Sequence, residues 1–125
     1  MTTSPHTVGA DQTLAHAHQL LREFRIRHLP VLRGGELVGM LTERDLALIE
    51  TMRDVDPSEI RVEEAMSSGI FAVSPDAPLD DVVDEMAAKK YGSAVVVQNQ
   101  KVVGILTVVD VCSALAALLR GRLAH

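Results

Sequence analysis

An internal duplication is the feature of this sequence that most constrains its fold. The stretch GMLTERDL at residues 39–46 recurs as GILTVVDV at residues 104–111, with glycine, threonine and aspartate in the same relative positions. Leu14 and Leu79 stand the same 65 residues apart as these two stretches, and no gap is needed between the anchors. A constant offset over so long a stretch indicates two copies of one structural unit. Each copy is too small to bury a sheet and its helices alone, so we expect the two to share a core.

Each copy begins with a short extended piece, at residues 7–8 and 71–73, followed by a turn rich in Asp, Pro and Gly. Apolar residues then recur at steps of three and four, which predicts one buried face of a helix. These residues are Leu14, Ala17, Leu21 and Phe24 in copy one and Leu79, Val82, Val83 and Met86 in copy two. Thr13 suits the N-cap of the first helix and Pro78 the N1 position of its counterpart.

A β-hairpin follows in both copies. HLPVLRGGELVGML and SAVVVQNQKVVGIL each hold two β-rich runs around a two-residue turn, Gly34 with Gly35 or Asn99 with Gln100. A second helix is predicted to begin after Thr42 and after Thr107. The order β-α-β-β-α in each copy predicts an α/β (α+β) fold of two repeats packed sheet to sheet with pseudo-two-fold symmetry.

We place repeat one at 1–53, a linker at 54–70, repeat two at 71–120 and a C-terminal tail at 121–125. The linker contains Pro57, Ser67, Ser68 and Gly69, which mark breaks, and we expect a short helix at 62–66.

Composition excludes several classes of function. The net charge of −5 argues against a nucleic-acid-binding protein, which needs a basic face. No apolar stretch approaches the roughly 20 residues that span a bilayer, and the N-terminus resembles no secretion signal, so we expect a cytoplasmic protein without a membrane segment. His16 and His18 lie two apart, whereas a metal pair on a helix needs a spacing of four. The sequence contains no recognisable combination of a catalytic nucleophile with a base, and no set of metal ligands, so we do not expect an enzyme.

The repeated T-x-x-D motif, Thr42 with Asp45 and Thr107 with Asp110, allows two interpretations. Threonine followed three residues later by an acid, before an apolar run, is typical of a capping box that needs no ligand. A helix start also presents free N–H groups that suit a nucleotide, and a carboxylate there can accept hydrogen bonds from ribose hydroxyls. The two roles compete, because an aspartate that caps its helix is less free to reach a ribose.

The stretches IRHLPVLRGGELVGMLTERDL, AVSPDAPLDDVVDEM and GILTVVDV resemble a pair of CBS domains, the regulatory modules named for cystathionine β-synthase, over about residues 6–118. The resemblance implies that each Asp binds a ribose, with the Thr near sugar and phosphate. It places adenine between strands against aliphatic side chains and backbone, which adds Ile70 and Ala72 to the candidate ligand-binding residues. Arg27 and His28 stand where family members meet phosphate.

Arg44, inside the first motif, is a further candidate for phosphate. Copy two has Gly92 and Ser93 where copy one has Arg27 and His28, so we expect one good nucleotide site and one weaker or empty site.

The resulting prediction is a stand-alone regulatory sensor of an adenosine-containing ligand, with no obligatory cofactor and no catalysis. AMP, ADP, ATP, NAD and S-adenosylmethionine are not distinguished. The alternative is an unliganded scaffold for dimerisation or partner docking. The last predicted helix, VVDVCSALAALLRGRL, is apolar on most sides, so we expect a homodimer or a separate effector protein to cover it.

Overall fold

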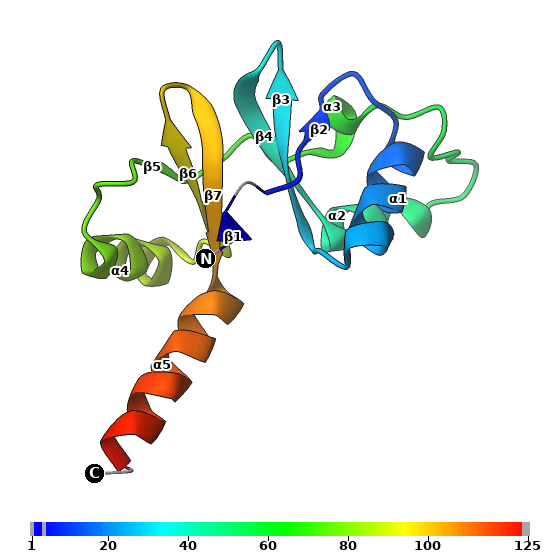
Figure 1. The fold of residues 1–125 in the computed structure, drawn as a ribbon. Helices are drawn as coiled ribbons and strands as arrows, with labels where there is room; N and C mark the ends of the chain where they lie inside the picture. Colours follow the sequence, from blue (N-terminus) through cyan, green and yellow to red (C-terminus); the bar gives the residue numbers. More distant parts are fainter. Residues whose placement is uncertain (1, 4, 124–125) are drawn as a thin grey trace.

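The computed structural model describes residues 2–3 and 5–123 and arranges them in two similar units (Figure 1). The predicted order β-α-β-β-α is confirmed in both. The first unit consists of β2 (Val8–Gly9), α1 (Leu14–Phe24), β3 (His28–Arg33), β4 (Glu36–Thr42) and α2 (Glu43–Glu50). The second consists of β5 (Ala72–Val73), α4 (Leu79–Lys89), β6 (Ser93–Gln98), β7 (Lys101–Thr107) and α5 (Val108–Leu123). Two further elements are β1 (Thr2–Thr3) and α3 (Val62–Ala65), the latter within the helix predicted at 62–66.

The two sheets have matching topology and register. In each, the short first strand runs parallel to the next (β2 with β3, β5 with β6), and a hairpin adds an antiparallel strand (β4 or β7). The hairpin turns are the predicted ones, with positive φ at Gly34 and Gly35 and at Asn99 and Gln100. Positive φ at both turn residues matches the right-handed twist of the strands, so both turns favour the same tight hairpin.

The leading segment of each unit crosses to the sheet of the other unit. Strand β1 pairs with β7, placing Thr2 opposite Ile105. Ser67 bridges Met40 of β4 through two backbone hydrogen bonds of 2.9 Å. Because these two pairings are related by the same 65-residue offset, the crossing is itself duplicated.

The space between the sheets is filled by an apolar cluster that draws on both units. Met40 of β4 packs with Val95 of β6 and Ile105 of β7, and Ile70 and Val97 lie against them. The two repeats therefore pack sheet to sheet with pseudo-two-fold symmetry, as predicted.

The starts of the two equivalent helices differ in burial. Leu14 is fully buried beneath the chain at 57–62, where its N–H donates to the Ile60 carbonyl and Val62 joins the same core. Leu79, predicted on the buried face of α4, is instead 65 % exposed. The reason is that the chain leaves α2 at Glu50 and returns over α1, whereas the equivalent helix α5 runs on to Leu123 and projects away from the sheets (Figure 1).

Two further predictions about the helices are wrong. Phe24 lies outside the core, where its ring stacks on His6 at a centroid distance of 3.7 Å. Pro78 occupies the N-cap position of α4 rather than N1, because the helix begins only at Leu79. Thr13 is the N-cap of α1 as expected, and its hydroxyl accepts a hydrogen bond from the His16 N–H.

The predicted domain boundaries, 1–53 and 71–120 with a linker at 54–70 and a tail at 121–125, stay predictions. Within the linker, α3 contributes Val62 to the core of the first unit. Helix α5 continues to Leu123, and residues 124–125 lie outside the described residues. In the part of the chain that the structure describes, no helix combines the length and apolar character needed to cross a membrane.

Candidate functional site

Both T-x-x-D motifs form complete capping boxes. In the first, the Asp45 N–H donates to the Thr42 hydroxyl at 3.2 Å, and the Thr42 N–H donates to Asp45 Oδ2 at 2.9 Å. Thr107 and Asp110 repeat these bonds with the same distances. The motif therefore ends a strand and starts a helix in each repeat. Each box engages only Oδ2 of its carboxylate and leaves Oδ1 outside it.

His28 is the residue on which the two motifs converge. It begins β3, lies opposite Thr42 in the sheet and is half-buried. Burial, followed by the neighbouring charge of Arg27, lowers the pKa of His28, while Asp110 and Asp45 act in the opposite direction. One carboxylate from each repeat therefore lies close enough for its charge to act on the same imidazole.

Two cavities lie between the repeats beside these motifs. One, of about 300 Å³, contains Thr107 and is lined by Pro5, His6, Arg25, Ile26, Arg27, His28, Ile105, Thr107 and Val109. The other, of about 540 Å³, contains Thr42 and is lined by Arg27, His28, Thr42, Glu43, Arg44, Ala47 and Gly92. We name them the Thr107 cavity and the Thr42 cavity. Their walls correspond in part through the 65-residue offset, since Thr42 matches Thr107 and Arg44 matches Val109.

The structure brings together five of the nine predicted ligand-binding residues as cavity walls. Thr42 and Arg44 line one cavity, Thr107 lines the other, and Arg27 and His28 line both. Asp45 and Asp110 are not among the residues that line either cavity, and the capping boxes bond each of them to its threonine.

Ile70 and Ala72 are placed differently from the other candidates. Ile70 is half-buried against the apolar cluster between the sheets. Ala72 is exposed on β5, where it pairs with Val95. Neither residue is among those that line the two cavities.

Sequence reasoning missed several cavity residues, among them His6, Val109 and Gly92. The duplication itself carries the signal that could have found two of them, because Val109 is the counterpart of Arg44 and Gly92 the counterpart of Arg27. His6 carries no such signal, since it reaches the Thr107 cavity only through the folding of the chain between β1 and β2.

Arg27 is free to change its partner. Its side chain is 77 % exposed and forms only a loose ion pair with the Glu43 carboxylate, at 3.7 Å. An exposed pair at this distance contributes little stability, so the guanidinium can turn toward an anion in either cavity.

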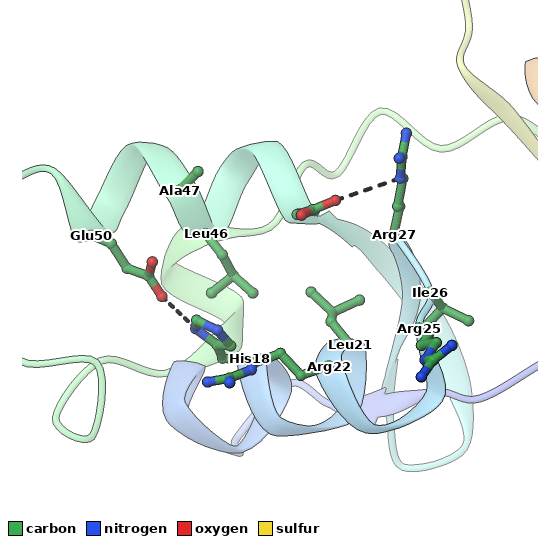
Figure 2. Close-up of a pocket in the computed structure, with 10 residues that line it drawn as sticks. His18, Leu21, Arg22, Arg25, Ile26, Arg27, Leu46, Ala47 and Glu50 are labelled. Carbon is green, nitrogen blue, oxygen red and sulfur yellow. Dashed lines mark hydrogen bonds and ion pairs between the residues drawn. The ribbon is translucent and has the colours of Figure 1, made fainter.

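A further pocket of about 400 Å³ lies within repeat one, between α1 and α2 (Figure 2). Leu21 and Leu46 point toward each other across it, and a His18–Glu50 pair joins the two helices at one end. None of the T-x-x-D threonines or aspartates lines this pocket. We place the candidate site in the cleft instead, because residues of both repeats and both copies of the motif meet there.

Among the described residues, no group of three or more His, Cys, Asp or Glu side chains is placed to hold a metal ion. The cavity walls offer a ligand the Thr42 and Thr107 side chains, the imidazoles of His6 and His28, and the guanidinium groups of Arg25, Arg27 and Arg44, with the Glu43 carboxylate among them. The Asp45 and Asp110 carboxylates are bonded to the N–H groups of the two threonines.

Comparison with known proteins places this architecture in a family. The sequence profile of the CBS domain matches residues 1–50 and 62–117. The CBS domain-containing protein YhcV of Bacillus subtilis is 34% identical over 110 residues, covering 88% of this chain and 78% of that protein.

Two crystal structures share the fold, each with a TM-score of 0.82. One is of a protein described as acetoin utilization protein AcuB from Vibrio cholerae, 29% identical, with 100% of this chain and 93% of that chain covered. The other is the CBS domain pair of protein MJ0100 in complex with 5′-methylthioadenosine and S-adenosyl-L-methionine, 26% identical, with 94% and 92% covered. The duplicated unit, its sheet-to-sheet packing and these matches agree, and the chain belongs to the CBS domain family as a tandem pair of CBS domains.

Proposed function

We propose that this CBS pair is a cytoplasmic regulatory module, not an enzyme, that binds an adenosine-containing ligand in the cleft between its repeats. The observation that carries the proposal is the pair of inter-repeat cavities, each walled by the threonine of one T-x-x-D motif and by Arg27 and His28. The complex of the MJ0100 CBS pair with two adenosine compounds supports the same class of ligand.

In this proposal the two aspartates accept hydrogen bonds from the ribose hydroxyls. Oδ2 of Asp45 and of Asp110 accepts the N–H of its own N-cap threonine. Oδ1 remains for the ribose hydroxyls, so one carboxylate can cap its helix and hold a sugar together. The half-buried position of both aspartates strengthens such a bond relative to one in water.

The remaining candidates contribute to the two ends of the ligand. Arg27, His28 and Arg44 meet phosphate groups, because the cavity walls hold them beside the motif threonines. Adenine lies against aliphatic walls, which Ile26, Ile105 and Val109 supply in the Thr107 cavity. The candidates Ile70 and Ala72 line neither cavity, so they would meet adenine only if it reached beyond the cavity walls. AMP, ADP, ATP, NAD and S-adenosylmethionine all carry the adenosine that this arrangement would read.

A thermal-shift screen with these five compounds, adenosine, and GTP as a negative control tests the proposal. Ligand at one hundred times Kd stabilises the fold by about 2.7 kcal/mol, a shift of several degrees for a chain of this size. A shift with at least one adenosine compound and none with GTP is expected. No shift with any compound would contradict the proposal.

A second candidate, the unliganded scaffold, is favoured by the completeness of both capping boxes, which satisfy the motif residues without a ligand. Under this reading the output of the protein is partner docking alone, and the screen would show no shift.

We further propose that the protein acts as a homodimer through α5 and signals to a separate effector protein. Leu115 and Leu118 of α5 are 53 % and 56 % exposed, and Leu119 is exposed beside them. Sedimentation velocity is expected to give a dimer, and Leu118→Glu a monomer, whereas Leu79→Glu on α4 serves as a control with an equally exposed leucine. A wild-type monomer at high concentration would contradict the dimer.

A further inference from the structure

Arg27 and His28 line both the Thr42 cavity and the Thr107 cavity, although each cavity has its own T-x-x-D threonine. Their counterparts at the 65-residue offset are Gly92 and Ser93, which carry no charge. The duplication therefore supplied two sugar-reading motifs but only one arginine–histidine pair to serve both cavities.

We propose that the two ligand sites compete for this single pair, so that a second phosphorylated adenosine compound binds the cleft more weakly than the first, while uncharged adenosine fills both sites with similar affinity. The proposal rests on the proposed function, because it concerns how ligands share the same cleft.

The position of the two residues supports the competition. The Arg27 side chain is mostly exposed and pairs loosely with Glu43 at 3.7 Å, so it can serve either cavity but not both at once. His28 is fixed at the start of β3 and half-buried, with charge effects from both Asp45 and Asp110 reaching it.

The negative charges in the cleft also disfavour the binding of a second phosphate. Asp45 and Asp110 already bring two negative charges, and a phosphate monoester adds about −1.5 to −2 near neutral pH. A first phosphate finds Arg27 and His28, whereas a second meets the first phosphate and both carboxylates. We expect the second to bind at least about tenfold more weakly, since a partly desolvated like-charge contact of this kind readily costs one order of magnitude.

Each cavity also has one arginine of its own, Arg44 in the Thr42 cavity and Arg25 in the Thr107 cavity. Both are exposed, Arg44 in the first turn of α2 and Arg25 at the C-cap of α1. If these private arginines held the phosphates, the two sites would bind independently. The experiment is designed to separate this case from the shared pair.

Calorimetric titrations of the full chain with adenosine and with AMP test the proposal. We expect adenosine to fill two sites per chain with similar affinity, and AMP to bind in two steps whose affinities differ by about tenfold or more. In Arg27→Gly/His28→Ser, which copies the residues of repeat two, AMP is expected to lose its tight first step, and the two steps become alike. Arg27→Gln/His28→Gln is the second variant should the first not fold, and Arg53→Gln, an exposed arginine that lines neither cavity, controls for net charge.

Each result decides something different. Two AMP molecules binding with equal affinity to the wild type, or an unchanged two-step titration in the double variant, would overturn the competition and leave the proposed function intact. Adenosine binding without AMP binding would also overturn it, because Arg27 and His28 would then attract no phosphate. No binding of either compound would overturn the competition, and the screen of the other adenosine compounds then decides whether the proposed function falls with it.

Discussion

Gly39→Ala tests the duplicated crossing that sets the two sheets, and so the cleft, against each other. A Cβ at Gly39 would clash with Met66 Sδ and stand 3.0 Å from the Ser67 carbonyl oxygen. The Met66 thioether can turn aside, but the Ser67 carbonyl is fixed, because Ser67 exchanges two backbone hydrogen bonds of 2.9 Å with Met40. The added methyl must therefore displace the backbone at the crossing.

Overpacking of this kind typically costs about 1–3 kcal/mol. For a chain of this length each kcal/mol lowers Tm by about 4 °C, so we expect a fall of roughly 4–12 °C. Urea unfolding and a thermal melt measure the effect. Gly69→Ala is the matched control, because it lies in the same segment and its Cβ would meet only Ser67 Oγ, at 3.9 Å.

The reasoning predicts that the Gly39 variant alone loses stability, and that any loss of ligand affinity follows from a shifted cleft. Equal stability of the Gly39 and Gly69 variants would refute it, because the chain could then cross β4 without the close approach that excludes a side chain.

Two further predictions concern His28 and one hairpin turn. Burial, and after it the charge of Arg27, lowers the pKa of His28 from its ordinary value near 6.5. The imidazole is therefore protonated at a higher pH in the unfolded chain than in the folded protein. As a result, the free energy of unfolding falls as the pH drops through about 6.5 toward the lower pKa of the folded state. Urea titrations at about pH 8 and about pH 5 should show a smaller loss in His28→Gln than in the wild type, and an equal loss would mean that His28 is not desolvated. Gln100 is not glycine but adopts a φ of 66°, a conformation that is costly for a residue with a Cβ. Gln100→Gly should therefore increase the free energy of unfolding by up to about 1 kcal/mol, seen as a higher urea midpoint with an unchanged slope. An unchanged or lower midpoint would show that the turn carries no such strain.

The duplicated pattern made most of the fold predictable. The offset between GMLTERDL and GILTVVDV located both hairpins and both pairs of helices, because the same local rules act on both copies. Periodicity reports which residues share a face but not what covers that face. Leu14 and Leu79 look alike in sequence, yet only Leu14 lies beneath a returning chain.

The candidate site was predictable in part for the same reason. The motif threonines belong to the repeated T-x-x-D motif, and the Arg27–His28 pair comes directly at the start of the first predicted hairpin. The structure brings these residues to one cleft. The sharing of that pair by two cavities depends on how the repeats face each other, which no local pattern records. The exchange of β1 into the second sheet was likewise unpredicted, because two threonines near the N-terminus have no distinctive periodicity.

The central claim is that Asp45 and Asp110 bind the ribose of an adenosine compound as well as capping their helices. Calorimetry of Asp45→Asn/Asp110→Asn with the compound that gives the largest thermal shift tests this most directly, with Asp84→Asn, an exposed aspartate of α4, as the control. Asparagine retains an acceptor for the cap, so the variant should fold. The account predicts that binding is lost in the double variant and unchanged in the Asp84 variant. Wild-type affinity in the folded double variant would contradict it and leave the motif as two helix caps.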